Sequence, residues 1–231
     1  MNIVTSLKKS SMVSSMALIA WVLCAPVSAA EHPGYEFDPG QSRGGIGKFY
    51  LGREISGVMG HQAAGWLERT ERTHEEMPDE VVANMQLEPH HVVADIGAGT
   101  GYFTFRMAPQ VSEGKVIATD IQPEMLALLE ERKAALGITN VETVRGQIDD
   151  PGLMPETVDA VLLVDAYHEF SHPFEMMQGI YDALRPGGKV FLVEYRKEDD
   201  SVPIRPLHKM SEEQVVREMS VFGLHWDDTL D

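Results

Sequence analysis

The chain has 231 residues, which is enough for one domain with a sizeable hydrophobic core. Its 36 Asp and Glu residues outnumber its 19 Lys and Arg residues, so the formal net charge is −17. Such a surface repels nucleic-acid phosphates and anionic lipid headgroups, which excludes both as predicted partners.

The first 30 residues have the pattern of a secretory signal peptide. Lys8 and Lys9 form a short basic region, residues 16–23 form an apolar run, and cleavage is predicted after Ala29 or Ala30. The apolar run is shorter than a stretch that crosses a bilayer, so we expect no stable membrane insertion after cleavage. The expected location of the mature protein is therefore the periplasm or the exterior of the cell.

Cleavage would remove Cys24, the only cysteine of the chain. The mature protein would then have no thiol, which excludes disulfides, cysteine-bound metal and thiolate catalysis. Two alternatives keep the segment on the protein: an uncleaved anchor, and a lipoprotein modified at Cys24.

Residues 31–77 are expected to form an N-terminal lid with a helical extension. Glycine and polar residues dominate 31–60, which predicts irregular structure. A helical pattern follows over 61–73, and a second helix is predicted over 78–85, with a proline at its first turn.

Short apolar runs then alternate with helical patterns. Apolar runs bounded by turn signals are typical of buried parallel strands, which helices connect in right-handed units. The predicted strands are residues 92–96, 115–120, 141–144, 158–164, 189–195 and 224–226, and the predicted helices are residues 102–111, 123–136, 173–184 and 211–222. The pattern predicts an α/β fold with a mostly parallel sheet.

The sharpest motif follows the first of these strands, where residues 95–101 (DIGAGTG) lead into a helix. The glycines let the backbone turn tightly and let a ligand approach it closely. A dinucleotide motif needs a third glycine where Tyr102 stands, and Asp95 would repel a pyrophosphate. A ligand with an ammonium group fits better, and S-adenosylmethionine is such a ligand.

Polar positions recur at the ends of the next strands. Asp120 ends the second strand, where an acid accepts hydrogen bonds from both ribose hydroxyls. Gln147 and Ile148 follow the third strand and are expected to flank the adenine. Asp165 lies at the carboxyl end of the fourth strand, beside the switch point of the sheet.

At these residues the chain resembles the class I S-adenosylmethionine-dependent methyltransferases. The segments DIGAGTGYF, ATDIQPEML and LRPGGKVFLVE are similar to the family's first, second and fifth-strand motifs, over about residues 78–226. The resemblance implies a Rossmann-like three-layer αβα sandwich of strand order 3-2-1-4-5-7-6, with an antiparallel last strand. It also implies S-adenosyl-L-methionine as cofactor and a methyltransferase domain over residues 78–231.

The family's sheet ends in a β-hairpin, whereas this sequence has room for one strand after its last helix, so either the hairpin is truncated or residues 224–226 fill a single strand position. Residues 52–76 with DAYHEFSHP and PIRPLHKM resemble exported bacterial methyltransferase-domain proteins of unestablished substrate. The residues expected to hold the cofactor are Asp95, Gly97, Ala98, Gly99, Gly101, Tyr102, Asp120, Ile121, Gln147, Ile148, Asp149 and Asp165.

Residues 168–172 (HEFSH) match the zinc-protease pattern His-Glu-x-x-His. That chemistry needs both histidines on one face of a continuous helix, and Pro173 disfavours helix at the residue before it. We therefore expect a loop that holds no metal, with His172 as a structural cap. A loop metal site that uses both histidines is the alternative.

In a methyltransferase this loop faces the transferred methyl group. His61, Tyr167, Glu169 and Glu194 are expected to enclose the acceptor, and His168 is the predicted general base. The alternative for His168 is a hydrogen bond to a lid loop without chemistry.

The sequence thus predicts a methyltransferase that acts on a small-molecule acceptor. S-adenosylmethionine is made in the cytoplasm and the chain is predicted to be exported, so a non-catalytic nucleoside-binding protein on the same fold is a second hypothesis. A zinc hydrolase is the third.

Overall fold

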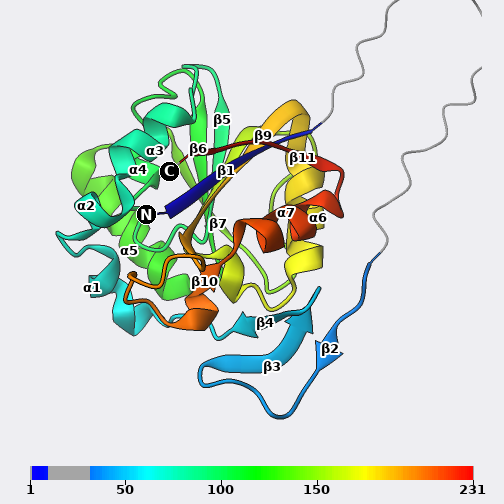
Figure 1. Cartoon of the computed structure of the whole chain (residues 1–231). Coiled ribbons are helices and arrows are strands. Elements are labelled where there is room, and N and C mark those ends of the chain that lie inside the picture. The colour runs from blue at the N-terminus through cyan, green and yellow to red at the C-terminus, as the bar shows by residue number, and fades with distance from the viewer. Residues whose placement is uncertain (1, 10–31, 231) are drawn as a thin grey trace, which may run out of the picture.

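The computed structural model describes residues 2–9 and 32–230 (Figure 1). A twisted central sheet has the order β11-β1-β9-β8-β5-β6-β7, with the short β10 paired to β9. Its parallel strands are β5 (Val92–Ile96), β6 (Lys115–Asp120), β7 (Val141–Arg145), β8 (Val158–Val164), β9 (Leu184–Arg196) and β10 (Lys209–Met210). The predicted α/β class and the strand order 3-2-1-4-5 are confirmed.

Helices cover both faces of the sheet because successive strand residues point to opposite sides. On one face, Ile96 and Leu163 pack with residues of α6 (Pro173–Ala183) and α7 (Glu212–Ser220). On the other, Val93 and Leu162 pack with residues of α3 (Pro78–Asn84), α4 (Thr104–Met107) and α5 (Pro123–Leu136). Strands buried on both faces explain the continuous apolar runs in the sequence.

The helix limits follow local capping signals. Helix α5 ends at Gly137, whose φ of +66° is left-handed, and Ser211 Oγ accepts the Gln214 N–H at the start of α7. The predicted helix over 102–111 is shorter than expected, because only Thr104–Met107 is α-helical and turns surround it.

The edge of the sheet differs from the expected C-terminal hairpin. One strand, β11 (Leu224–Leu230), follows α7, and β1 (Asn2–Lys9) lies antiparallel between β9 and β11. An N-terminal segment therefore supplies the antiparallel strand that the sequence leaves missing.

Strand β1 belongs to the segment for which the sequence predicts a signal peptide, and residues 10–30 of that segment lie outside the described residues. The sheet contains β1 only in a chain that keeps residues 2–9, so cleavage and this strand exclude each other. Export stays a prediction.

The N-terminal lid has more structure than the sequence indicates. A small antiparallel sheet contains β2 (Glu36–Phe37), β3 (Gly45–Tyr50) and β4 (Arg53–Ser56), and it lies beside the end of the main sheet near β10 (Figure 1). Leu51 and Gly52 turn the β3–β4 hairpin with φ of +47° and +86°. A Leu-Gly pair is not a common signal for this turn, so the prediction of irregular structure was wrong here.

The helix predicted over 61–73 is broken into η1 (His61–Ala63), α1 (Ala64–Leu67) and α2 (Arg72–Glu76). Two arginines satisfy carbonyl groups that the break exposes: Arg69 Nη1 donates to Trp66 O, and Arg72 Nη1 donates to Leu67 O. The break turns Trp66 and Leu67 toward the cavity described below.

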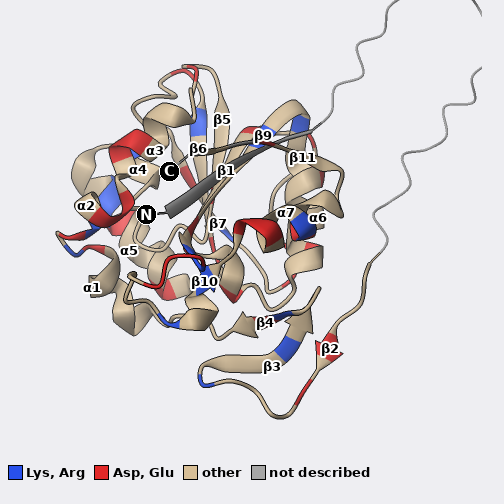
Figure 2. Ribbon diagram, viewed as in Figure 1, with Lys and Arg blue, Asp and Glu red and all other residues tan. Residues whose placement is uncertain are grey.

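Acidic residues are spread over α2, α3 and α7, with basic residues scattered among them (Figure 2). Within the part of the chain that the structure describes, no helix combines the length and apolar character needed to cross a membrane.

Candidate active site

A cavity of about 550 Å³ opens at the carboxyl ends of the parallel strands. This volume lies within the range of small-molecule sites. The glycine loop after β5 and the acid that ends β6 line one part of it. The segment before β10 and the residues after β8 line the other. Residues on its lid side that the sequence did not single out as ligands are Val58, Trp66, Leu67 and Arg72.

The first two glycines of the loop line the cavity, and each is required by local crowding. Gly97 and Gly99 have φ of +73° and +54°, and a Cβ atom would lie 2.9 Å from Ala166 Cβ and 2.8 Å from Leu67 Cδ1, respectively. Gly101 is different, because it does not line the cavity. A Cβ atom at this position would lie 2.6 Å from Phe105 Cε2, so the glycine makes room for the Phe105 ring. Gly101 therefore serves helix packing, which its assignment to the cofactor missed.

Asp95 lies at the floor of the cavity and is 3% exposed. Its Oδ2 accepts the Thr104 hydroxyl at 2.5 Å. Burial raises the pKa of Asp95 to about 6, with the nearby Asp120 adding to this, although Thr104 and Arg72 act in the opposite direction. Because burial destabilises the charged form of this carboxylate, a cationic ligand beside it would stabilise that form strongly.

This raised pKa gives a test of the ammonium assignment. A bound ammonium group favours the charged carboxylate, so binding releases a proton below pH 6, and affinity should rise with pH. We expect S-adenosylmethionine affinity to be about tenfold lower at pH 5 than at pH 7. Calorimetry at both pH values measures this, and Asp95→Asn should flatten the dependence while weakening binding at pH 7. Asp120 and Asp165, whose pKa values burial also raises, leave a residual slope of the same sign. An unchanged slope in Asp95→Asn would contradict the assignment.

Asp120 connects three parts of the site. Its Oδ2 accepts the Gly99 N–H at 2.9 Å and its Oδ1 accepts the Gln122 N–H at 2.8 Å. Gln122 in turn donates to Met59 O and accepts the His61 N–H. The lid is thereby tied to the end of β6, and Asp120 lines the cavity with acceptor capacity left on its carboxylate.

The apolar rim near the end of β7 matches the predicted adenine position. Gln147 and Ile148 line the cavity together with Ile121, and the two isoleucines are exposed. Asp149, which was also assigned to the cofactor, does not line it. Ala98 and Tyr102 do, as the sequence predicted.

Arg72 is a cavity residue that the sequence patterns did not single out. It is 5% exposed, its Nε donates to Glu76 at 2.6 Å, and it packs over the Tyr102 ring. Among the described residues no hydrogen bond occupies its Nη2. A guanidinium beside Asp95 suits a ligand that has both a carboxylate and an ammonium group.

Asp165 has a strained backbone, with φ of +50°, at the end of β8. Asp165 lines the cavity, and its Oδ1 is buried and has no hydrogen-bond partner among the described residues. Burial raises the pKa of Asp165 to about 7, although the nearby His168 opposes this. A buried acceptor without a donor fits a site completed by a ligand.

Three residues predicted near the acceptor lie behind the cavity wall. Tyr167 and Glu194 are buried and do not line the cavity, and neither does His168, which is 0% exposed. Tyr167 OH donates to Glu218 on α7, and Glu194 accepts the Tyr167 N–H, so both hold the turn η2 (Tyr167–Glu169) in place. His61 is also outside, with its side chain 3.7 Å from Glu124, whereas neighbouring Met59 lines the cavity.

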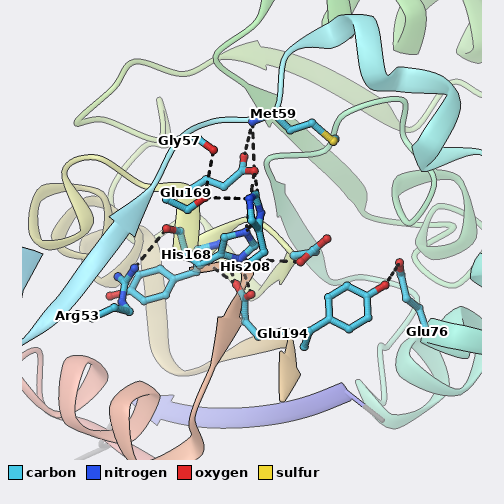
Figure 3. Close-up of polar contacts among 12 residues, drawn as sticks. Arg53, Gly57, Met59, Glu76, His168, Glu169, Glu194 and His208 are labelled. Atoms are coloured by element: carbon cyan, nitrogen blue, oxygen red, sulfur yellow. Dashed lines mark hydrogen bonds and ion pairs between the residues drawn. The ribbon is translucent and has the colours of Figure 1, made fainter. Parts of the chain in front are cut away.

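His168 connects Glu194 to a histidine that does reach the cavity (Figure 3). Its Nδ1 donates to Glu194 Oε2 at 2.6 Å, and its Nε2 lies 3.0 Å from His208 Nδ1. Burial by itself lowers the pKa of His168, but the Glu194 carboxylate outweighs it and raises the pKa to about 9. Burial beside His168 lowers the pKa of His208 to about 4. His208 therefore takes the position at the acceptor end that the sequence assigned to His168.

Glu169 lines the same end of the cavity, as predicted, and both of its oxygens accept the Met59 N–H at 3.1 Å. His172 lies apart at the start of α6, with its Nδ1 3.0 Å from Ser171 Oγ. The two histidines of the His-Glu-x-x-His pattern therefore do not meet, as the expected loop conformation implies.

Comparison with known proteins gives a family match over the middle of the chain. A family model described as a methyltransferase domain matches residues 93–188. An uncharacterized methyltransferase-like protein of Schizosaccharomyces pombe is 37% identical over 112 residues, covering 48% of this chain and 41% of that protein. A ubiquinone/menaquinone biosynthesis C-methyltransferase of a Marinomonas species is 24% identical over 147 residues, covering 63% and 56%.

The crystal structure of a SAM dependent methyltransferase from Aquifex aeolicus superposes with a TM-score of 0.68 at 24% identity, covering 72% of this chain and 89% of that one. The chain spans about half the length of the two curated relatives named above.

The strand order and the glycine-lined cavity define a class I, Rossmann-like methyltransferase fold. The family match covers residues 93–188, which include the glycine loop and both acids at the cofactor end of the cavity, so this part of the chain is similar to S-adenosylmethionine-dependent methyltransferase domains. S-adenosylmethionine is the cofactor of this family, and the site fits it: the glycine loop is too crowded for side chains, and Asp165 Oδ1 lacks a donor.

Proposed function

We propose that the chain transfers the methyl group of S-adenosylmethionine to a small-molecule acceptor. The observation that carries this proposal is the continuity of the cavity, which extends from Asp95 and Asp120 to Glu169 and His208. One ligand can therefore lie along the glycine loop while a second occupies the far end.

Different residues of the cavity would bind different parts of the two ligands. Arg72 and Asp95 are placed to bind the carboxylate and ammonium groups of the cofactor, and Asp120 to bind the ribose. The bound cofactor supplies an activated methyl group on a sulfonium centre, so the protein's task is to orient the acceptor and exclude water. The lid residues Val58 and Met59 cover the site for this purpose.

A small acceptor is supported by the shape and charge of the far end. The 203–208 segment and the residues after β8 enclose it, and the net charge of −17 opposes nucleic-acid substrates. His208 is neutral over the physiological range because its pKa is lowered to about 4, so it is placed to contact the acceptor as a neutral group.

Calorimetry with S-adenosylmethionine, S-adenosylhomocysteine and NAD⁺ tests the cofactor part. We expect both sulfur nucleosides to bind and the dinucleotide to fail, since Asp95 faces the position of its pyrophosphate. Binding of NAD⁺ alone would overturn the proposal. Release of S-adenosylhomocysteine with a panel of small hydroxyl, thiol and amine compounds then tests turnover. Tight cofactor binding without any release would favour the non-catalytic nucleoside-binding protein.

A further inference from the structure

Three side chains converge at the acceptor end of the cavity in a way that methyl transfer does not require (Figure 3). His168 Nε2 lies 3.0 Å from His208 Nδ1 and 3.9 Å from Glu169 Oε1. His208 Nδ1 lies 3.7 Å from the same Glu169 oxygen. The three potential ligand atoms come from the turn η2 and from η3 (Pro206–His208), which is about forty residues further along the chain.

The outer nitrogen of each histidine is already occupied. His168 Nδ1 donates to Glu194 Oε2 at 2.6 Å. His208 Nε2 lies 3.2 Å from Ser56 Oγ, whose own hydroxyl donates to Gly57 O, so the His208 nitrogen is the donor of that pair. These partners occupy the outer nitrogens, so His168 Nε2 and His208 Nδ1 are the two nitrogens that face each other.

A proton on His168 Nε2 bridges this 3.0 Å contact in the metal-free protein, and a metal ion bound by both nitrogens would replace that proton. Ligand atoms around tetrahedral zinc are separated by about 3.3 Å, since Zn–N distances are about 2.0–2.1 Å. The three observed separations lie on both sides of that value. Small side-chain rotations would therefore bring all three atoms into a coordination shell.

The donor set and its surroundings favour a transition metal. Two imidazoles with one carboxylate form the ligand set of catalytic zinc sites, whereas Mg²⁺ and Ca²⁺ prefer oxygen ligands. In such sites the second nitrogen of a histidine ligand usually donates to a carboxylate, which orients the ring. Glu194 would orient His168 in this way. Asp165 Oδ1, 3.9 Å from His168 Nδ1, adds negative charge.

We propose that His168, Glu169 and His208 bind a divalent transition-metal ion of the zinc type. Glu169 and His208 line the cavity, so the open coordination position faces the acceptor. The His-Glu pair of the sequence motif is used, but His208 replaces His172, because η2 is a single turn and cannot bring residues 168 and 172 to one face. A metal at this position was not expected from the sequence.

The consequence for the reaction rests on the proposed function. The ion would bind the acceptor's hydroxyl or thiol, whose proton leaves to solvent. A lone pair of the resulting oxygen or sulfur then forms the bond to the methyl carbon, and the electron pair of the broken carbon–sulfur bond stays on the cofactor sulfur. The acceptor class is accordingly a small alcohol, phenol or thiol.

Metal binding is measured on the chelator-treated full chain by calorimetry with Zn²⁺ and by the visible absorption of Co²⁺. We expect one tight site with the spectrum of a nitrogen- and oxygen-ligated Co²⁺. His208→Ala and Glu169→Gln should each lower the affinity by more than about 100-fold, and Glu194→Gln by about 10- to 100-fold. His172→Ala should leave it unchanged.

A second group on the described surface, Glu88, His90 and His91, offers a competing site, so His90→Ala/His91→Ala is the matched control. Loss of binding in that variant alone, or equal affinities for His208→Ala and His172→Ala, would overturn the proposal. Circular dichroism and S-adenosylhomocysteine binding check that each variant is folded. Zinc binding that depends on His208 in a protein that binds no nucleoside would sustain the metal site and reject the methyltransferase function.

Discussion

Replacing Asp120 by Ala is expected to lower the affinity for S-adenosylmethionine by about 100-fold or more. A hydrogen bond to a charged group contributes about 1.5–3 kcal/mol, and the carboxylate is placed to accept two from the ribose. About 1.4 kcal/mol corresponds to a factor of ten in affinity, so both bonds together give at least this loss. Calorimetric titration with S-adenosylmethionine and S-adenosylhomocysteine measures it.

The control for this variant is Asp149→Ala, which removes a carboxylate near the same rim but outside the cavity and should leave affinity unchanged. Asp120 also accepts the Gly99 N–H, so part of its effect could come from a loosened loop. A cofactor analogue without ribose hydroxyls separates the two contributions: wild type should lose affinity for it, and Asp120→Ala should lose little more. If Asp120→Ala lost as much affinity for the analogue as for S-adenosylmethionine, the ribose contact would be contradicted.

The second large effect is expected on stability, from Arg53 in the small sheet. Its Nε and Nη2 donate to the two oxygens of Glu218 at 2.7 and 2.9 Å, and Glu218 is 0% exposed. Removing one partner of a buried pair leaves an uncompensated charge and costs about 3–5 kcal/mol. Arg53→Ala should therefore lower the free energy of unfolding by that amount, as measured by urea denaturation followed by circular dichroism.

Helix α7 offers the matched control. Arg217 and Glu213 form an ion pair at 2.7 Å on its exposed side, and Arg217→Ala should change the free energy of unfolding by less than about 1 kcal/mol. A double variant, Arg53→Met with Glu218→Gln, should recover much of the loss, because it removes both charges and keeps an acceptor for Tyr167 OH. Equal effects of Arg53→Ala and Arg217→Ala would show that burial of the pair contributes nothing.

The Arg53 contacts also explain how the small sheet organises the site. Arg53 Nη1 donates to His168 O at 3.2 Å, and Ser56 on the same strand contacts His208. Strand β4 therefore helps to position both His168 and His208, of which only His208 lines the cavity. Sequence patterns gave no indication of this, because β4 lies more than one hundred residues before η2 and η3 in the chain.

The core of the cofactor site was predictable because its signals are local. The strand that ends at Ile96, the glycines that follow it and the acid at position 120 each lie next to the element that positions them. In a parallel sheet the carboxyl ends of strands meet at one edge, so local placement along the chain already implies proximity in space. The same reasoning placed Asp165 and Gln147 on the cavity wall.

The amino-acid sequence by itself determined the α/β alternation, the positions of the parallel strands β5 to β9 and the glycine-and-acid set for the cofactor, because periodicity, turn residues and strand ends act over a few neighbouring residues. Only the tertiary structure decided that His168 turns away from the cavity toward Glu194, that His208 meets it from another loop, and that Arg72 enters the site. These outcomes depend on contacts between distant segments, where packing, burial of charge and the pairing of donors with acceptors select one arrangement among many that the local pattern allows.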